Sequence, residues 1–250
     1  MSAAFYLKKM GYPVTVFEKE KRPGGMLMNG IPSFRLEKDV INAEIDVLRE
    51  MGVEFKCGVE VGEDITIAQL REQGYKAFYI AIGAQGGRMT GVPGEDAVGV
   101  ETGVDFLRRV NLNEEGVKLS GKTVVIGGGN VAVDVARTAL RTGSSDVSMF
   151  CLESRDIMPA ADDEVAEAEE EGIVVNNSWG PKEILTENGK VTAVVFKKCI
   201  SVLDENKRFS PKYDDEELLT VPCDQVLLSI GQSIKWGAVL EGTRGEFNPN

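Results

Sequence analysis

Val124-Val125-Ile126-Gly127-Gly128-Gly129-Asn130-Val131-Ala132 is the stretch of sequence that decides the expected fold. Its apolar, β-branched start predicts a strand, the glycine triplet predicts a tight turn, and the residues from Asn130 to Arg141 predict a helix. Gly127 permits the turn, Gly129 lets the backbone approach a pyrophosphate, and Ala132 lets helix and strand pack closely. A G-x-G-x-x-A pattern between a strand and a helix is typical of a dinucleotide-binding domain.

The chain after this helix strengthens that interpretation. A second apolar strand is expected over Val147–Leu152, and it ends at Glu153. The separation of Glu153 from the glycine turn is close to the distance at which a dinucleotide-binding domain carries its ribose-binding carboxylate. A bare glycine triplet could be a flexible turn, but a following strand that ends in an acid favours the dinucleotide site.

Strands and helices alternate along most of the chain. Before the glycine turn we expect helix Ser2–Met10, strand Val14–Glu18, helix Leu36–Met51, strand Val53–Cys57, helix Ile67–Glu72 and buried strand Ala77–Ile82. After Glu153 we expect helix Ala160–Glu171, strand Ile173–Asn177, an antiparallel excursion with strands Val191–Cys199 and Leu218–Pro222, and strand Val226–Ile230. This alternation predicts parallel sheets with helices on both faces.

The order of elements occurs twice. Strand-Glu18, helix, strand and Ala81-Ile82-Gly83-Ala84 match strand-Glu153, helix, strand and Ser229-Ile230-Gly231-Gln232. The fold class expected is therefore α/β with two Rossmann-like domains. We expect a partial first domain at residues 1–95, a nicotinamide-dinucleotide domain at 96–232, and a return toward the first domain at 233–250.

Composition excludes several kinds of chemistry. The chain has 28 Lys and Arg, 40 Asp and Glu, a formal net charge of −12 and no histidine. Imidazole bases and histidine-ligated metals are therefore excluded, and an acidic surface makes nucleic acid and anionic membranes poor partners. No apolar run reaches the ~18–20 residues of a membrane span, so we expect a cytoplasmic protein. The four widely spaced cysteines predict neither a metal site nor a redox pair.

Glu18 raises a question about the start of the chain. Its own glycine turn would lie roughly 20 residues earlier, at or before residue 1. We expect that the first domain lacks its first strand and phosphate loop, which would leave a sheet edge open to dimerisation. The alternative is that Glu18 is an ordinary carboxylate at a strand end.

Specific segments are distributed over the whole chain: Pro23-Gly24-Gly25-Met26-Leu27, Gly30-Ile31-Pro32 with Phe34-Arg35-Leu36, Ala81-Ile82-Gly83-Ala84, the glycine turn with Asp134, Met158-Pro159-Ala160 and Ile230-Gly231-Gln232. Together they resemble the small (beta) subunit of glutamate synthase and its relatives, two-dinucleotide flavoenzymes of the glutathione-reductase-like fold. The chain differs from that family in lacking the N-terminal glycine loop, the C-terminal Gly-Asp segment and the preceding cysteine-rich region.

The resemblance implies FAD on the first domain and NADH or NADPH on the second. The residues it assigns to cofactor binding are Glu18, Arg22, Gly24, Gly25, Leu27, Arg35, Ala81, Gly83, Gly127, Gly128, Gly129, Asn130, Val131, Asp134, Glu153, Arg155, Ile230 and Gly231. Catalysis would consist of hydride transfer from the nicotinamide to the flavin, and the protein would supply binding and orientation. No residue is predicted to act as an acid or base.

Two further expectations concern specificity and partners. NADH is favoured over NADPH because Glu153 would face the 2′-phosphate of NADPH. Electrons would pass to a redox protein or to an amidotransferase-type large subunit, and a homodimer is possible. The alternative function is a non-catalytic dinucleotide-binding module without bound FAD.

Overall fold

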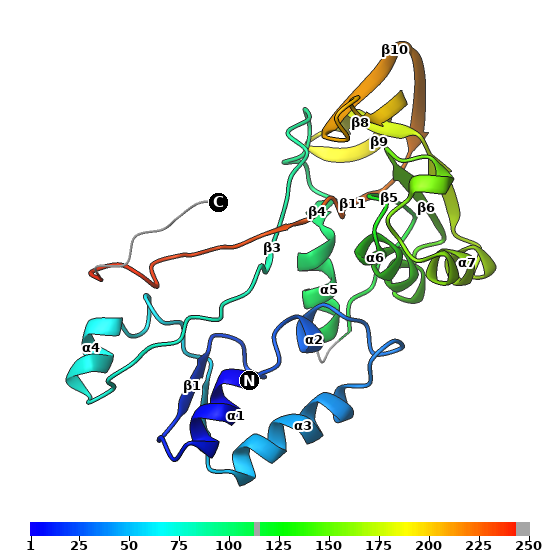
Figure 1. Cartoon of the computed structure of the whole chain (residues 1–250). Coiled ribbons are helices and arrows are strands. Elements are labelled where there is room, and N and C mark those ends of the chain that lie inside the picture. The colour runs from blue at the N-terminus through cyan, green and yellow to red at the C-terminus, as the bar shows by residue number, and fades with distance from the viewer. Residues whose placement is uncertain (113–115, 244–250) are drawn as a thin grey trace. The chain divides into compact units, whose positions relative to one another are not determined.

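The computed structural model describes residues 1–112 and 116–243 (Figure 1). The chain divides into two compact units. One contains Met1–Gln85 and residues 234–243 of the C-terminal segment, and the other contains Gly86–Ser233. The second unit carries the glycine turn.

A five-stranded parallel sheet forms the centre of the second unit, with strand order β4-β11-β5-β6-β7. Its strands are β4 (Val100–Thr102), β5 (Lys122–Ile126), β6 (Asp146–Cys151), β7 (Val174–Asn177) and β11 (Gln225–Leu228). Apolar, buried residues occupy the last three positions of both β5 and β11, as expected for strands that are covered on both faces.

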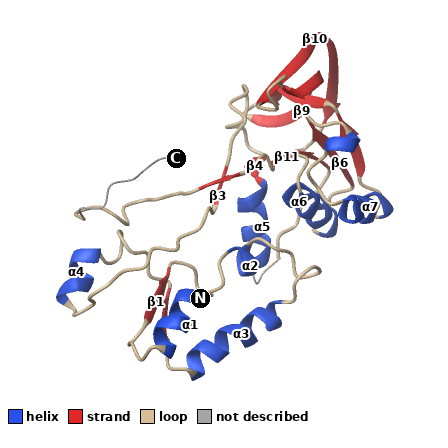
Figure 2. Cartoon of the chain, viewed as in Figure 1, coloured by secondary structure: helices blue, strands red, loops and turns tan. Residues whose placement is uncertain are grey.

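Three helices cover one face of this sheet: α5 (Gly103–Leu112), α6 (Asn130–Arg141) and α7 (Asp162–Glu170) (Figure 2). Their apolar side chains form one core with the strand residues Val125, Met149 and Leu227. A short 3-10 turn, Arg155–Ile157, lies between β6 and α7.

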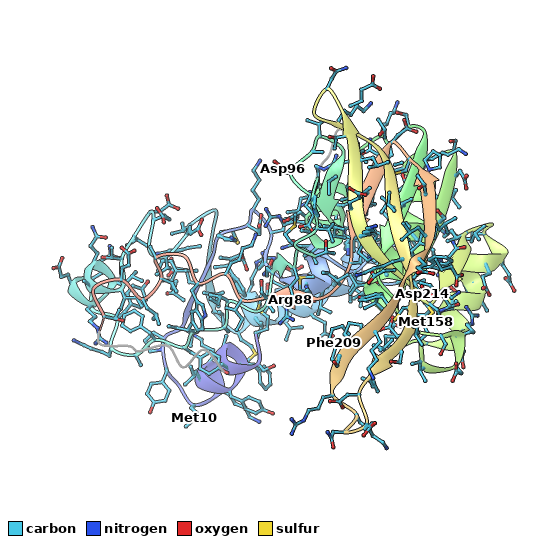
Figure 3. All side chains as sticks on the ribbon, turned by 90° about the horizontal axis from the view of Figure 1, so that it is seen from above. Met10, Arg88, Asp96, Met158, Phe209 and Asp214 are labelled. Atoms are coloured by element: carbon cyan, nitrogen blue, oxygen red, sulfur yellow. The ribbon has the colours of Figure 1, made fainter. Side chains whose placement is uncertain are left out.

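An antiparallel sheet covers the other face. It consists of β8 (Trp179–Glu187), β9 (Lys190–Leu203) and β10 (Phe209–Pro222), and β9 lies in the middle. Phe196 of β9 stacks on Phe150 of β6 with ring centroids 4.1 Å apart. The expectation of helices on both faces is therefore wrong for this unit, because a sheet supplies the second apolar cover. Figure 3 shows the β9–β10 ribbon extending to Phe209 near its end.

Two further strands of this unit, each of two residues, pair with one another. Strand β3 (Gly86–Gly87) pairs antiparallel with β12 (Gln232–Ser233). Both strands lie next to the points at which the chain enters and leaves the unit.

The first unit contains α1 (Ser2–Lys9), β1 (Thr15–Glu18), α2 (Met26–Asn29), α3 (Lys38–Glu50), β2 (Glu54–Cys57) and α4 (Ile67–Glu72). Strands β1 and β2 pair in parallel as a two-stranded sheet. Leu48 of α3 and Ala4 of α1 pack beside them, and Ile41 and Ile45 of α3 pack against Met28.

Several expected elements differ in the structure. Strands β9 and β10 are longer than the strands expected at Val191–Cys199 and Leu218–Pro222. The buried strand expected at Ala77–Ile82 is wrong, because no described strand pairs with this segment and Tyr79 is 75% exposed. Helix α7 begins at Asp162 rather than Ala160, because the backbone of Ala161 is extended (φ −64°, ψ 137°) and Ala161 is the N-cap. The N–H groups of Ala160 and Ala161 bind the carbonyl oxygen of Gly128 and Oδ1 of Asn130. Strand β8 and helix α5 were not predicted. Among the described residues, no helix is both long and apolar enough to cross a membrane.

Candidate dinucleotide site

The glycine turn lies where the carboxyl ends of three parallel strands meet. The N–H of Gly127 donates to the carbonyl oxygen of Phe150 at 2.8 Å, and the N–H of Ser229 donates to that of Ile126 at 2.7 Å. A Cβ on Gly127, whose φ is +148°, would lie 2.3 Å from the carbonyl oxygen of Ser229. The protein's own packing therefore requires glycine at this position.

Gly128 lies directly against the predicted ribose-binding residue. A Cβ at this position would lie 2.8 Å from Oε2 of Glu153 and 3.0 Å from the Cβ of Cys151. The structure therefore brings Glu153, from the end of β6, next to the glycine turn. Here too the absence of a side chain is explained by neighbouring protein atoms.

Gly129 is different. A Cβ on it would meet no described heavy atom within 4 Å, and its extended backbone (φ −97°, ψ 173°) is open to any residue. It is the N-cap of α6, and no side chain caps that helix. The first N–H groups of a helix lack partners within the helix and favour an anion. Packing of the protein therefore gives no reason for glycine at this position, and the open space beside it leaves room for a ligand.

The remaining residues of the turn connect it to the next loop. Oδ1 of Asn130 accepts the N–H of Ala161 at 2.8 Å, and the N–H of Ala160 donates to the Gly128 carbonyl oxygen at 3.0 Å. Val131 packs against the core, and Asp134 is buried at 5% exposure. Ala160 and Ala161 were not predicted as site residues, although the Met158-Pro159-Ala160 motif marked their segment.

Arg155 points to a neighbour on α7. Its guanidinium nitrogens lie 3.2 and 3.1 Å from the two carboxylate oxygens of Glu169, in a pair whose side chains are both nearly half exposed. In this structure its charge is therefore engaged by Glu169 and is not directed at Glu153.

Ile230 and Gly231 follow β11 beside the turn. Gly231 has a φ of +112°, and its carbonyl oxygen accepts the N–H of Arg88 at 3.1 Å. The side-chain Nε of Arg88 donates to the carbonyl oxygen of Gln232 at 3.0 Å. Arg88 is thus a further residue of this corner that the sequence did not indicate, since it lies far from Gly231 along the chain.

In the first unit, Glu18 ends β1 as predicted. Its Oε1 accepts the N–H of Glu20 at 3.0 Å, and burial raises the pKa of its carboxyl above the ordinary value. The Glu18 carboxylate could accept the hydroxyl groups of a ribose. Hydrogen bonds from those hydroxyl groups would favour the charged carboxylate and so lower the pKa that burial raises.

The loops expected along the flavin are also in the first unit. Gly24 (φ +133°) packs on Met28 and Ile41, and a Cβ on Gly25 would lie 3.9 Å from Nε2 of Gln85. The segment that contains Ala81 and Gly83 therefore approaches the Gly24-Gly25 turn. Arg22, Leu27, Arg35, Ala81 and Gly83 are exposed. The described part of this unit contains no strand, glycine turn and helix like those at residues 122–141.

Lys38 holds the loop after Gly25. Its ammonium group donates to the carbonyl oxygen of Leu27 at 3.0 Å and also to that of Ile31. Burial lowers the pKa of Lys38. This lysine was not predicted as part of the site, and its sequence context contains no motif that would have marked it.

No disulfide joins the cysteines in the described part of the chain. All four are free, and Cys151, Cys199 and Cys223 are buried. Burial raises the pKa of Cys151 to about 11 and that of Cys223 to about 12, so their thiols stay protonated at neutral pH. Among the described residues, no group of three or more His, Cys, Asp or Glu side chains could hold a metal ion.

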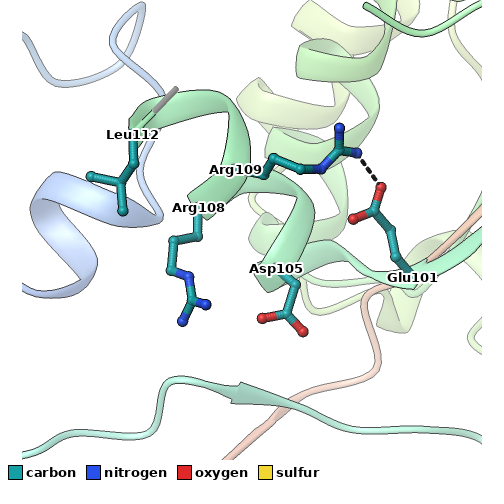
Figure 4. Close-up of a pocket in the computed structure, with 5 residues that line it drawn as sticks. All are labelled: Glu101, Asp105, Arg108, Arg109 and Leu112. Atoms are coloured by element: carbon teal, nitrogen blue, oxygen red, sulfur yellow. Dashed lines mark hydrogen bonds and ion pairs between the residues drawn. The ribbon is translucent and has the colours of Figure 1, made fainter. Parts of the chain in front are cut away.

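A surface hollow beside α5 lies apart from these residues. It is lined by Glu101, Asp105, Arg108, Arg109 and Leu112, and Arg109 pairs with Glu101 (Figure 4). None of the predicted site residues lines it, so it contributes nothing to the candidate site.

The parallel sheet, the glycine turn and the acid at the end of the next strand define the class: a dinucleotide-binding protein of the glutathione-reductase-like fold. FprA of Mycobacterium tuberculosis in complex with NADPH aligns with a TM-score of 0.79 at 22% identity, over 92% of this chain and 68% of that chain. Thioredoxin reductase of Lactococcus lactis aligns with a TM-score of 0.63 at 20% identity, over 92% of this chain and 73% of that chain. The predicted fold class is confirmed.

Residues 1–240 match the family model described as pyridine nucleotide-disulphide oxidoreductase, and the chain belongs to this enzyme family. The NADP(+)-dependent formate dehydrogenase subunit beta of Moorella thermoacetica is 38% identical, over 99% of this chain and 36% of that protein. The NAD-dependent dihydropyrimidine dehydrogenase subunit PreT of Escherichia coli K12 is 35% identical, over 96% of this chain and 53% of that protein.

The predicted resemblance to glutamate synthase small subunits is confirmed as well. A putative glutamate synthase (NADPH) small chain of Cereibacter sphaeroides is 33% identical, over 92% of this chain and 58% of that protein. The chain thus spans from about a third to somewhat more than half of the length of these relatives.

Proposed function

We propose that the second unit binds a nicotinamide dinucleotide with its pyrophosphate over Gly127–Ala132 and its adenosine ribose at Glu153. The observation that carries this proposal is the open space at Gly129, next to the uncapped N-terminus of α6. A helix N-terminus with small residues stabilises phosphate through its N–H groups and its dipole. Glu153, whose carboxylate lies next to Gly128, would accept both hydroxyl groups of the ribose.

We further propose that the chain is part of an NAD(P)H-dependent flavin oxidoreductase. When the two cofactors are bound, the reduced nicotinamide supplies a hydride that FAD can accept. In the first unit, Glu18 would bind the adenosine ribose of FAD, and the Gly24-Gly25 turn and the loop held by Lys38 would line its pyrophosphate and flavin. The names of the relatives support this proposal, since each refers to NAD or NADP.

NADH is the preferred nicotinamide in this proposal. The 2′-phosphate of NADPH would lie a few ångströms from the Glu153 carboxylate, and at an effective dielectric of about 20 the repulsion is on the order of several kcal/mol before screening. Arg155 would have to leave Glu169 to offset that repulsion. The relatives' names include both NAD and NADP, so they support either cofactor.

The test compares dissociation constants of NADH and NADPH by calorimetry for the wild-type chain and for Glu153→Arg. We expect tighter binding of NADH by the wild type and a reversed ratio in the variant. Glu170→Arg on α7 is the matched control, since it makes the same charge change at an exposed residue. Tighter binding of NADPH by the wild type, or an unchanged ratio in Glu153→Arg, would contradict the preference.

The electron acceptor is proposed to be a partner redox protein or a large amidotransferase-type subunit, since several relatives are named as subunits. A non-catalytic dinucleotide-binding module is the second candidate, supported by the small two-stranded sheet of the first unit. Flavin absorbance of the purified chain and NADH oxidation with ferricyanide separate the two. Bound flavin that NADH reduces favours the enzyme, and NADH binding without flavin favours the module.

A further inference from the structure

We propose that Asn177, at the end of β7, is a positioning residue that sets the choice between NADH and NADPH by holding the turn that carries Glu153. This inference rests on the proposed role of Glu153 in ribose recognition. Among the described residues, the Asn177 side chain forms no hydrogen bond to a predicted phosphate-binding residue or to the carboxylate of Glu153. It acts on the backbone and neighbouring side chains of the Glu153 turn.

The Asn177 side chain forms hydrogen bonds to three residues at or next to that turn. Its Nδ2 lies 3.2 Å from the carbonyl oxygen of Glu153, 3.2 Å from Sγ of Cys151 and 3.7 Å from Sδ of Met158. Cys151 is the last residue of β6, and Glu153 and Met158 lie in the loop between β6 and α7. An amide nitrogen has two hydrogens, so the carbonyl oxygen and the thiol can both be satisfied at once.

The backbone next to Asn177 supports the same turn. The N–H of Ser178 donates to the Glu153 carbonyl oxygen at 3.0 Å, and Ser178 has a φ of +63°, a conformation that non-glycine residues rarely adopt. Its own carbonyl oxygen accepts the N–H of Cys199 at 2.8 Å, which holds it in place from β9. Strained backbone of this kind persists only where surrounding contacts determine it.

The buried thiol of Cys151 completes the arrangement. Burial raises its pKa to about 11, so it remains a donor at neutral pH, and its Sγ lies 3.5 Å from the Glu153 carbonyl oxygen. That oxygen therefore receives three donors: a side-chain amide, a backbone amide and a thiol.

The far end of the same loop is fixed to the glycine turn through Ala160 and Ala161. Between the attachment at Glu153 and the attachment at Ala160 and Ala161, Asn177 also contacts Met158 in the interior of the loop. The consequence is that the Glu153 carboxylate stays beside Gly128. Without the amide, the turn can relax, and the carboxylate moves away from the position where it would accept ribose hydroxyls and repel a 2′-phosphate.

The experiment measures NADH and NADPH dissociation constants for the full chain carrying Asn177→Ala, Asn176→Ala or Glu153→Gln. Asn176 is the matched control: it is the preceding asparagine of β7, and its Nδ2 donates to the Met149 carbonyl oxygen at 3.2 Å within the sheet. We expect Asn177→Ala to weaken NADH binding about 5-fold or more, while NADPH binding stays unchanged or becomes tighter because the 2′-phosphate is repelled less. Asn176→Ala should leave their ratio unchanged.

Amide hydrogen exchange of the ligand-free chain gives a second readout. Residues 153–158 should exchange faster in Asn177→Ala than in Asn176→Ala. If Glu153→Gln lowers the preference for NADH but Asn177→Ala changes both cofactors equally or not at all, the positioning role is overturned and the proposed function stands. If Glu153→Gln itself leaves the ratio unchanged, the ribose assignment fails, and this inference fails with it.

Discussion

The carbonyl oxygen of Ser229 lies 2.3 Å from the position that a Cβ on Gly127 would take, whereas a Cβ on Gly129 would meet no described atom within 4 Å. Protein packing therefore explains the glycine at position 127 of this motif but not the glycine at position 129. Gly127 is required by contact between β11 and the turn after β5, and Gly129 faces space that a ligand would fill. Substitutions can separate these roles.

Gly127→Ala should destabilise the fold. Its methyl group would overlap backbone that cannot move without disturbing β11, and overpacking of this kind costs about 1–3 kcal/mol. Urea unfolding of the wild type and the variant measures the loss. An unfolding free energy within about 0.5 kcal/mol of the wild type would contradict the close approach of Ser229.

Gly129→Val should leave the fold intact and impair ligand binding. Loss of a preferred N-cap residue costs on the order of 1 kcal/mol or less, but the side chain would occupy the space proposed for the pyrophosphate. We expect at least a tenfold weaker dissociation constant for NADH, equivalent to about 1.4 kcal/mol. Unchanged affinity by calorimetry in a folded variant would place the pyrophosphate elsewhere.

The ion pairs between α6 and α7 should make stability depend on acid pH. A hydrogen bond from Arg141 lowers the pKa of Glu171 below its ordinary value of 4.5, burial of the carboxyl partly opposes this, and a hydrogen bond from Arg137 lowers the pKa further. A carboxyl with a lowered folded-state pKa stabilises the fold above the unfolded value and loses that contribution as pH falls through the folded value. Wild type should therefore lose stability below about pH 4.5 more steeply than Arg141→Ala.

Arg49→Ala is the control for this experiment, because its partner Asp46 is exposed at 61%. Exposed pairs contribute about 0–1 kcal/mol, so this variant should follow the wild-type pH profile. Urea unfolding at several pH values between 3 and 7, roughly the range over which carboxyl groups titrate, supplies the data. Parallel curves for wild type and Arg141→Ala would contradict the role of Glu171.

The cysteines should differ in reactivity. Cys57 is only half-buried, whereas Cys151, Cys199 and Cys223 are buried. Iodoacetamide should therefore label Cys57 of the native chain at least about tenfold faster than Cys151 or Cys223, whose thiolates are scarce at neutral pH. Peptide mass spectrometry after timed labelling measures the rates, and the denatured chain provides the reference. Equal rates in the native chain would mean that the buried thiols are accessible.

Local sequence was sufficient for the elements whose hydrogen bonds or turn chemistry lie within a short stretch. Helix α6 runs from Asn130 to Arg141 and α4 from Ile67 to Glu72, as predicted. A helix forms its backbone hydrogen bonds within one segment, and its apolar periodicity and end signals lie in that same continuous stretch of sequence. The placement of Glu153 at the end of a strand beside the glycine turn was predictable for the same reason, since adjacent parallel strands end at a common edge.

Tertiary structure alone decided which extended segments became strands and which atoms met. Residues 77–82 have the composition of a buried strand, but a strand exists only through its neighbours, and this segment has none among the described residues. Asn177 reaches Glu153 only because β6 and β7 pair in parallel. The motif predicts a tight turn at Gly127 and a pyrophosphate at Gly129, but only the packing of Ser229 against Gly127 shows that neighbouring protein atoms require glycine at one position and not at the other.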